Sequence, residues 1–310
     1  MKKTKIIIAG IGGVGGYFGG LLAKHFYESN EVEIYFLARG EHLKQIQSKG
    51  LKLVKGEVEF NVIPKLATDK ANEIGIADYI ILCTKSYDLE KTIEQLSPCI
   101  ANNTAILPLL NGVDSAEMIK SILPNVNVFN GCVYIVSLIK EPGVVENIGN
   151  IQKLFFGIDN TTSDELLLLE NIFKAASIEA TLTRNISANS WEKFHLVASN
   201  STATSYFKNT TGEILADKTK NEFLDSLLKE VNQIALAKGI LFDKDMVSNT
   251  MEKLKSLPFE TTSSMQRDFQ KLNTRTELET ITGYIVRAGK QLNIPTPTFK
   301  IAYDELKITI

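Results

Sequence analysis

The chain has 310 residues, 44% of them hydrophobic and 23% charged, and a formal net charge of −2. This composition is typical of a folded globular chain with room for two domains, and it excludes an intrinsically disordered protein. A nearly neutral charge gives no long-range attraction to nucleic acid or to an anionic membrane, so we expect neither as a partner.

The stretch from Lys5 to Ala23 predicts a buried strand, a glycine-rich turn and a helix. Its glycines follow the Gly-x-Gly-x-x-Gly pattern, in which the first allows a tight turn, the second admits a pyrophosphate and the third lets the helix pack on its strand. Unpaired N–H groups at the start of such a helix attract phosphate. The alternative is a secretory signal starting with basic residues 1–5, but the apolar segment after them meets a glycine too soon. We therefore predict a dinucleotide site at Gly10, Ile11, Gly12, Gly13, Val14 and Gly15.

A second strand is predicted over residues 31–37, followed by Ala38-Arg39-Gly40. The end of this strand is where a dinucleotide-binding fold meets the adenosine ribose, and an NAD site would offer a carboxylate to its 2′-hydroxyl. Arg39 instead suits a 2′-phosphate, because a guanidinium forms paired charge-assisted bonds to phosphate oxygens. We predict NADP as the cofactor; the alternative is that Arg39 is a solvated loop residue.

Buried strand patterns and helical periodicities then alternate, which is typical of a parallel sheet covered by helices on both faces. Two further strands are predicted over residues 78–83 and 104–110, and helices over residues 89–100 and 116–123.

Shorter β-like pieces follow, including residues 133–139 and 152–156, and we expect them to extend the sheet with antiparallel strands. A helix over residues 163–176 and a strand near residues 180–182 complete this part of the chain. The pattern predicts an NADP-binding α/β domain over residues 1–184.

Long helical periodicities, punctuated by glycines and prolines such as Gly212, predict an all-α domain over residues 185–310. A cleft between an α/β cofactor domain and a helical domain is a usual small-molecule site, so we expect the second domain to complete the substrate pocket. The predicted helices cover residues 186–207, 219–238, 244–257, 276–292 and 299–307.

The cysteines Cys83, Cys99 and Cys132 are scattered and odd in number, which argues against a disulfide framework and favours a cytoplasmic location. The three histidines show no metal-ligand spacing with each other or with the cysteines, so we predict no metal site.

Two polar residues follow predicted strands of the sheet. Lys85 is aimed at the carboxyl edge of the sheet, where a cofactor and an anionic substrate would meet. Asn111 ends the next strand, within an Asn-Gly pair that is also a common turn. Spacing alone does not separate these roles from an ordinary exposed lysine and a turn asparagine.

The predicted helical domain holds further candidates. Lys193 lies near the only tryptophan, Trp191, and the run over residues 198–205 is small, polar and poor in helix propensity, which suits close packing or a cleft lining. Two segments resemble helix starts, Ser263-Ser264-Met265 and Thr274-Arg-Thr-Glu277. The second matches a capping box, which by itself favours a structural role for Glu277.

In this order, the motifs resemble the ketopantoate reductase (2-dehydropantoate 2-reductase) family along nearly the whole chain. The resemblance implies a Rossmann domain followed by a helical domain similar to that of 6-phosphogluconate dehydrogenase. It also implies NADPH-dependent reduction of ketopantoate to pantoate, on the route to pantothenate and coenzyme A. The matching pieces are Gly10-x-Gly12-x-x-Gly15, Ala38-Arg39-Gly40, Thr84-Lys85-Ser-Tyr, Asn111-Gly112, Pro142-Gly143-Val-Val, Trp191-x-Lys193, Ser263-Ser264-Met265 and Thr276-Glu277-Leu278.

The resemblance also implies roles for single residues. Lys193 matches the family's proton donor, Glu277 its acidic partner in the substrate site, and Ser264 a serine that contacts the substrate. The remaining matches are polar positions near the nicotinamide and substrate at Lys85 and Asn111, and the arginine that meets the 2′-phosphate at Arg39.

The chain departs from the family where asparagines commonly stand four and eight residues after the lysine, because it has Val197 and Ser201 there. Asn200 returns to nearly the same helix face, so we expect Asn200 and Ser201 in the substrate site. One apparent extra residue also lies between Met265 and Glu277. These departures leave open a related NADP-dependent reductase of another 2-keto or 3-hydroxy acid, and an NADP-binding sensor without turnover. A homodimer is compatible with the sequence, which does not fix the oligomeric state.

Overall fold

The structure is a computed structural model of the chain and describes residues 3–271 and 275–309. By their internal contacts the residues form two units, which we call the sheet unit (Met1–Leu110 and Asp114–Ile186) and the helical unit (Asn111–Val113 and Ser187–Ile310). The short segment Asn111–Val113 thus belongs with the helical unit, although it lies far from that unit in the sequence. Across the described ranges, no helix combines the length and apolar character needed to cross a lipid bilayer.

The sheet unit is built on a six-stranded parallel sheet with the strand order β5-β2-β1-β6-β7-β8. Its central strand β1 carries an isoleucine run that is buried on both faces, as expected for a parallel sheet between helices. The strands are β1 (Thr4–Ala9), β2 (Val32–Leu37), β5 (Leu66–Thr68), β6 (Tyr79–Leu82), β7 (Ala105–Pro108) and β8 (Asn127–Val128).

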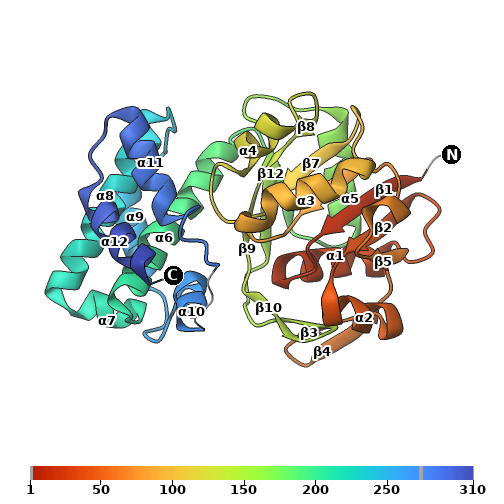
Figure 1. The fold of residues 1–310 in the computed structure, drawn as a ribbon, viewed down its shortest axis with the longest axis horizontal. Helices are drawn as coiled ribbons and strands as arrows, with labels where there is room; N and C mark the ends of the chain where they lie inside the picture. The colour runs from red at the N-terminus through yellow and green to blue at the C-terminus, as the bar shows by residue number, and fades with distance from the viewer. Residues whose placement is uncertain (1–2, 272–274, 310) are drawn as a thin grey trace. The chain divides into compact units, whose positions relative to one another are not determined.

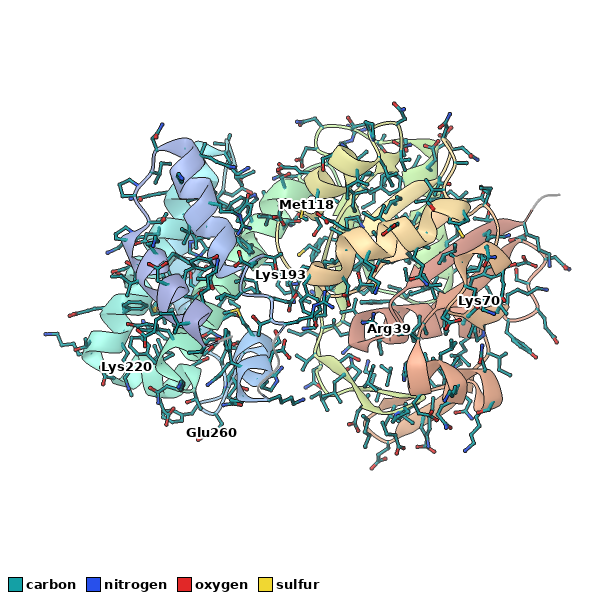
Figure 2. All side chains as sticks on the ribbon, viewed as in Figure 1. Arg39, Lys70, Met118, Lys193, Lys220 and Glu260 are labelled. Atoms are coloured by element: carbon teal, nitrogen blue, oxygen red, sulfur yellow. The ribbon has the colours of Figure 1, made fainter. Side chains whose placement is uncertain are left out.

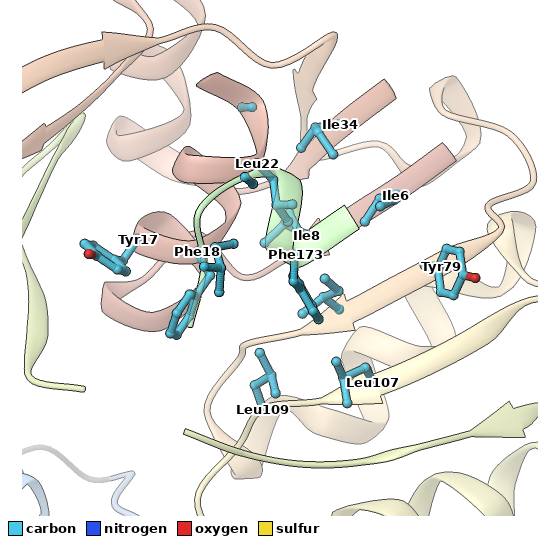
Figure 3. Packing of buried hydrophobic residues seen from close by; sticks show 14 of the residues in the cluster. Ile6, Ile8, Tyr17, Phe18, Leu22, Ile34, Tyr79, Leu107, Leu109 and Phe173 are labelled. Atoms are coloured by element: carbon cyan, nitrogen blue, oxygen red, sulfur yellow. The ribbon is translucent and has the colours of Figure 1, made fainter. Parts of the chain in front are cut away.

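Helices cover both faces of this sheet. Successive side chains of β1 point to opposite faces, so Ile6 and Ile8 pack with Phe18 and Leu22 of α1, whereas Ile7 packs on the opposite face, with α3 and α4. Figure 3 shows the first of these cores, and Figure 1 shows α3 lying across the strands. Each buried aliphatic or aromatic side chain contributes about 1.5–3 kcal/mol to folding. The helices are α1 (Gly13–His25), α2 (Gly40–Lys49), α3 (Leu89–Leu96), α4 (Ser115–Ile122) and α5 (Asp164–Ala175).

Two smaller sheets complete the sheet unit, with the orders β10-β11-β3-β4 and β13-β12-β9. The prediction that residues 133–139 and 152–156 extend the main sheet as antiparallel strands is therefore wrong. The single strand predicted over residues 133–139 is two strands that belong to different sheets, because β9 pairs with β12 and β10 pairs with β11. The strands are β3 (Leu51–Lys55), β4 (Val58–Val62), β9 (Asn130–Tyr134), β10 (Ser137–Glu141), β11 (Val144–Asn147), β12 (Lys153–Gly157) and β13 (Ala180–Thr183).

In the helical unit, the long helix α6 has the predicted bounds. Two predictions are wrong. Gly212 lies inside a short helix, where a Cβ atom would collide with the Phe259 ring, and the helix predicted from residue 276 begins only at Thr282. The helices are α6 (Ile186–Phe207), α7 (Thr211–Ala216), α8 (Lys218–Ala237), α9 (Met246–Lys255), α10 (Ser264–Gln270), α11 (Thr282–Leu292) and α12 (Pro297–Ile308).

The core of the helical unit is anchored by an aromatic cluster and by one buried carboxylate. The rings of Trp191 and Phe194 on α6 pack against Tyr284 of α11, with centroid separations of 5.6–6.1 Å. Glu230 of α8 accepts hydrogen bonds from the backbone N–H groups of Thr298 and Phe299 at 2.8 and 3.0 Å. A carboxylate at the start of α12 satisfies N–H groups that have no partner within the helix.

His195 makes the helical unit sensitive to acid. Its side chain is fully buried on α6, and burial lowers the pKa of the imidazole to about 4, well below its ordinary value. The His195 imidazole therefore takes up a proton near pH 6.5 in the unfolded chain but only near pH 4 in the folded chain. The contribution of this residue to the free energy of unfolding is fully present above pH 6.5 and is lost as the pH falls toward 4.

We expect the free energy of unfolding to fall by about 2 kcal/mol between pH 7.5 and pH 5 through this residue alone. Urea titrations at the two pH values should show a smaller difference for His195→Gln than for the parent. His25→Ala, which removes an exposed histidine of α1, serves as the control and should keep the parental difference. An equal pH dependence in the parent and in the His195 variant would contradict the assignment.

Candidate active site

The glycine-rich turn after β1 is shaped first by the packing of the sheet unit. Gly10 has a φ of +92°, and a Cβ atom there would lie 2.8 Å from the Thr84 nitrogen. A Cβ atom on Gly15 would collide with the Gly10 carbonyl oxygen. These two glycines therefore let β1, the end of β6 and α1 approach closely, as the sequence pattern predicts.

Gly12 has no such packing reason. A Cβ atom on Gly12 would meet no protein atom within 4 Å, so the space in front of α1 is open. Gly12 is the N-cap of α1, no side chain caps the helix, and its first turn holds no acidic residue. Backbone N–H groups at an uncapped helix start beside open space suit a phosphate group, so this turn fits the pyrophosphate of a dinucleotide.

Arg39 lies at the end of β2 and is the N-cap of α2 (Figure 2). Its Nη2 atom is 2.9 Å from Oδ2 of Asp88, a carboxylate that is only 8% exposed, whereas the arginine side chain is 76% exposed. A guanidinium has five N–H donors, so this ion pair leaves donors for a phosphate. Asp88 directly follows the Thr-Lys-Ser-Tyr motif, but nothing in the sequence pattern predicts its contact with Arg39.

Lys85 lies in the loop after β6, half-buried, and its carbonyl oxygen accepts the Asp88 N–H at 2.9 Å. The preceding Thr84 contacts the Gly10 turn, and its hydroxyl is buried without a hydrogen-bond partner among the described residues. Lys85 and the glycine-rich turn therefore occupy the carboxyl edge of the parallel sheet, where such folds bind their cofactor.

Three residues that are far apart in the sequence meet in the helical unit. Lys193 of α6 donates from Nζ to Oδ1 of Asn111 at 2.9 Å (Figure 2 labels Lys193). The Nδ2 atom of Asn111 makes a longer contact of 3.5 Å to Oε2 of Glu277. An ammonium, an amide and a carboxylate are thus connected in series. Lys193 and Asn111 are half-buried and the Glu277 residue is 2% exposed.

The turn before α11 places the Glu277 carboxylate. Leu278 and Ile281 are buried in the core, and the carbonyl oxygen of Glu277 accepts the Ile281 N–H at 3.0 Å. Ile281 is the N-cap of α11, and its φ of −106° and ψ of −80° are not helical, so the turn is separate from α11. Thr274, the other residue of the predicted capping box, lies outside the described residues.

The remaining candidates lie on α6 and α10. Ser263 caps α10 by accepting the Gln266 N–H at 3.0 Å, and Ser264, half-buried, is the first helical residue. The amide oxygen of Asn200 accepts the Thr211 hydroxyl at 3.0 Å, which joins α6 to α7, and Ser201 is 4% exposed. The contact with Thr211 thus gives Asn200 a structural role beside the predicted substrate contact.

Comparison with known proteins explains this combination of sites. The family profile described as "Ketopantoate reductase PanE/ApbA" matches residues 6–160, and its C-terminal counterpart matches residues 185–309. The chain belongs to the ketopantoate reductase family. The predicted family and the predicted fold class are therefore confirmed, and the family is one of NAD(P)-dependent oxidoreductases.

Named relatives of this family cover nearly the whole chain. A 2-dehydropantoate 2-reductase of Porphyromonas gingivalis has a crystal structure with 34% identity and a TM-score of 0.87, covering 98% of this chain and 99% of that one. A 2-dehydropantoate 2-reductase of Pyrococcus horikoshii is 29% identical, covering 94% of this chain and 93% of its own. An uncharacterized oxidoreductase of Bacillus subtilis, YkpB, is 27% identical over 98% of both chains.

The family's fold also occurs with another substrate. A ternary structure of D-mandelate dehydrogenase with NADH and anilino(oxo)acetate superposes with a TM-score of 0.84 at 22% identity, covering 99% of this chain and 98% of that one. At this identity the likeness concerns the fold alone.

Proposed function

We propose that this protein reduces 2-dehydropantoate to pantoate with NADPH as the hydride donor. The observation that carries the proposal is the line of contacts from Lys193 through Asn111 to Glu277, found in a chain of the ketopantoate reductase family. In these contacts, the polar groups of Asn111 and Glu277 hold in place a cation, the Lys193 ammonium, that is able to donate a proton.

Reduction of a keto group requires a hydride at carbon and a proton at oxygen. Bound NADPH supplies the hydride. Negative charge develops on the carbonyl oxygen, so the Lys193 ammonium stabilises that charge and donates the proton. Asn111 accepts one ammonium N–H, which fixes Nζ and leaves its other N–H groups for the substrate oxygen.

The other residues of the helical unit are assigned to substrate binding. The Glu277 carboxylate orients Lys193 through Asn111, or binds the substrate hydroxyl directly. Ser264 offers its hydroxyl to the substrate carboxylate. Ser201 and Asn200 are the remaining proposed contacts, and Asn200 offers its amide N–H groups because its oxygen already accepts from Thr211.

In the sheet unit, the turn at Gly10, Ile11, Gly12, Gly13, Val14 and Gly15 is proposed to bind the pyrophosphate. Lys85 is proposed to contact the cofactor near the substrate, together with Asn111. The preference for NADPH over NADH is assigned to Arg39.

Replacing Arg39 with alanine should raise the KM for NADPH about tenfold or more and change the KM for NADH little. The reason is that each charge-assisted bond to the 2′-phosphate contributes about 1.5–3 kcal/mol, and NADH lacks this phosphate. Steady-state kinetics with both cofactors test it. Lys44→Ala, which removes an exposed cation on the same helix α2, is the control and should alter neither constant. Equal weakening of both cofactors would move the discrimination to another residue.

The proposed reaction is tested by following NADPH oxidation with ketopantoate beside a panel of other 2-keto acids, one of them an aryl 2-keto acid. Val197 and Ser201, at positions where the family commonly has asparagine, favour a related reductase of another 2-keto or 3-hydroxy acid as the second candidate. A higher kcat/KM with another acid would select that candidate. NADPH binding without oxidation by any acid would leave a cofactor-binding sensor.

A further inference from the structure

A hairpin of the second sheet packs against the start of α1, next to the glycine-rich turn. Strands β10 and β11 pair antiparallel and contact α1 at its first residues. A Cβ atom on Gly13 would collide with the Ser137 carbonyl oxygen of β10, and one on Gly16 would lie 2.6 Å from Val145 of β11. Gly13 therefore has a packing role, in addition to the cofactor contact predicted for it.

The turn of this hairpin contains the Pro142-Gly143 pair, which the proposed reaction does not use. Gly143 has a φ of +82°, and a Cβ atom there would lie 2.7 Å from Gln45 of α2. The hairpin turn thus packs closely on α2, the helix that begins directly after Arg39.

His42 of α2 forms a hydrogen bond to the hairpin turn and lies close to the glycine-rich turn. Its Nδ1 atom accepts the Gly143 backbone N–H at 2.9 Å. Because Nδ1 accepts, the neutral ring carries its hydrogen on Nε2. Burial lowers the pKa of the imidazole, which favours this neutral form, and the Ile11 backbone carbonyl partly opposes that shift.

The Nε2 atom is sealed from solvent and has no partner of good hydrogen-bond geometry among the described residues. The Ile11 carbonyl raises the pKa of the imidazole, so it lies close to the ring without forming a hydrogen bond of good geometry to Nε2. Ile11 stands between Gly10 and Gly12, so this carbonyl belongs to the turn whose N–H groups face the open space in front of α1.

We propose that His42 is a positioning residue for NADPH. Its hydrogen bond holds the Gly143 turn, and with it the hairpin that packs against Gly13 and Gly16, in fixed relation to the start of α2, while its ring lies close to the Ile11 peptide. The inference rests on the proposed function, because it concerns the same cofactor site. The hairpin that His42 holds then supports both predicted phosphate contacts, because its strands pack against the first residues of α1 and its turn packs against the helix that begins after Arg39. Preorganised donors lose less conformational freedom when the ligand binds, so the benefit falls on cofactor affinity.

Isothermal titration of the full chain with NADPH tests this assignment. His42→Ala should raise the Kd about tenfold, because it removes the hydrogen bond to the Gly143 N–H together with the ring beside Ile11. The side chain in His42→Asn keeps an acceptor for the Gly143 N–H but is too short to reach Ile11. Its Kd should therefore lie between those of the parent and of His42→Ala. His25→Ala, the exposed histidine of α1, is the matched control and should keep the parental Kd.

A kinetic comparison separates positioning from a merely structural role. With saturating NADPH, the kcat and the keto-acid KM of His42→Ala should stay within about twofold of the parent, because only cofactor affinity is altered. A folded His42→Ala with parental NADPH affinity would overturn the proposal, even if its melting temperature fell. If the alanine variant does not fold, a parental Kd in His42→Asn overturns it.

The titrations also distinguish this inference from the proposed reaction. If the parent binds NADPH but oxidises it with none of the keto acids, the reaction is wrong and the Kd series still decides the role of His42. If the parent does not bind NADPH, both proposals are overturned.

Discussion

Replacing Lys193 with alanine is expected to lower kcat by about 10²- to 10⁴-fold while NADPH still binds, because the change removes the proposed general acid. The same change removes the cation that Asn111 holds at 2.9 Å, so charge on the substrate oxygen loses its stabilisation as well. Single-turnover measurements of NADPH oxidation report the chemical step directly.

Lys229→Ala is the matched control for this experiment, since it removes an exposed lysine of the same helical unit whose partner is Asp225 on α8. Its kcat should equal that of the parent, and circular dichroism should show both variants folded. Near-native turnover in a folded Lys193 variant would refute the assigned acid.

A valine at position 12 should abolish detectable NADPH binding and leave the protein folded. The structure leaves room for this side chain, because a Cβ atom on Gly12 meets nothing within 4 Å. The added methyl groups would instead occupy the open space in front of α1, between the backbone N–H groups and a pyrophosphate. Calorimetric titration with NADPH and a thermal melt measure the two expectations separately.

Gly13→Val provides the contrast, because its side chain would collide with the Ser137 carbonyl oxygen. We expect this variant to lose stability, unlike the Gly12 variant. Unchanged NADPH affinity in Gly12→Val would contradict the prediction that the glycine-rich turn binds the pyrophosphate.

The parts of the fold that were predictable are those that local patterns specify. The bounds of α6 follow from a long helical periodicity, and the central strands follow from short runs buried on both faces. The sheet formed by β3, β4, β10 and β11 was missed because its central pair joins Lys52 to Val144, far apart in the sequence. A strand's own alternation of apolar and polar residues does not tell which sheet it joins.

The candidate site shows the same limit. The resemblance to the family supplied Lys193 and Glu277, but neither spacing nor periodicity could show that Asn111 contacts both of them. The ion pair between Arg39 and Asp88 links the start of α2 to the start of α3, and the two residues are 49 positions apart in the sequence. The capping pattern around Glu277 pointed to a helix start, whereas burial of Leu278 and Ile281 holds this segment as a turn.

The segment Asn111–Val113 has a consequence for anyone who divides this protein into fragments. A fragment starting at residue 185 would contain Lys193 and Glu277 but would lack the amide between them, because Asn111 is encoded more than seventy codons earlier. Exchanging helical halves between relatives would likewise pair each lysine with a foreign asparagine loop. The transferable module is therefore discontinuous in the gene, and a chimera that respects it must carry residues 111–113 together with the C-terminal half.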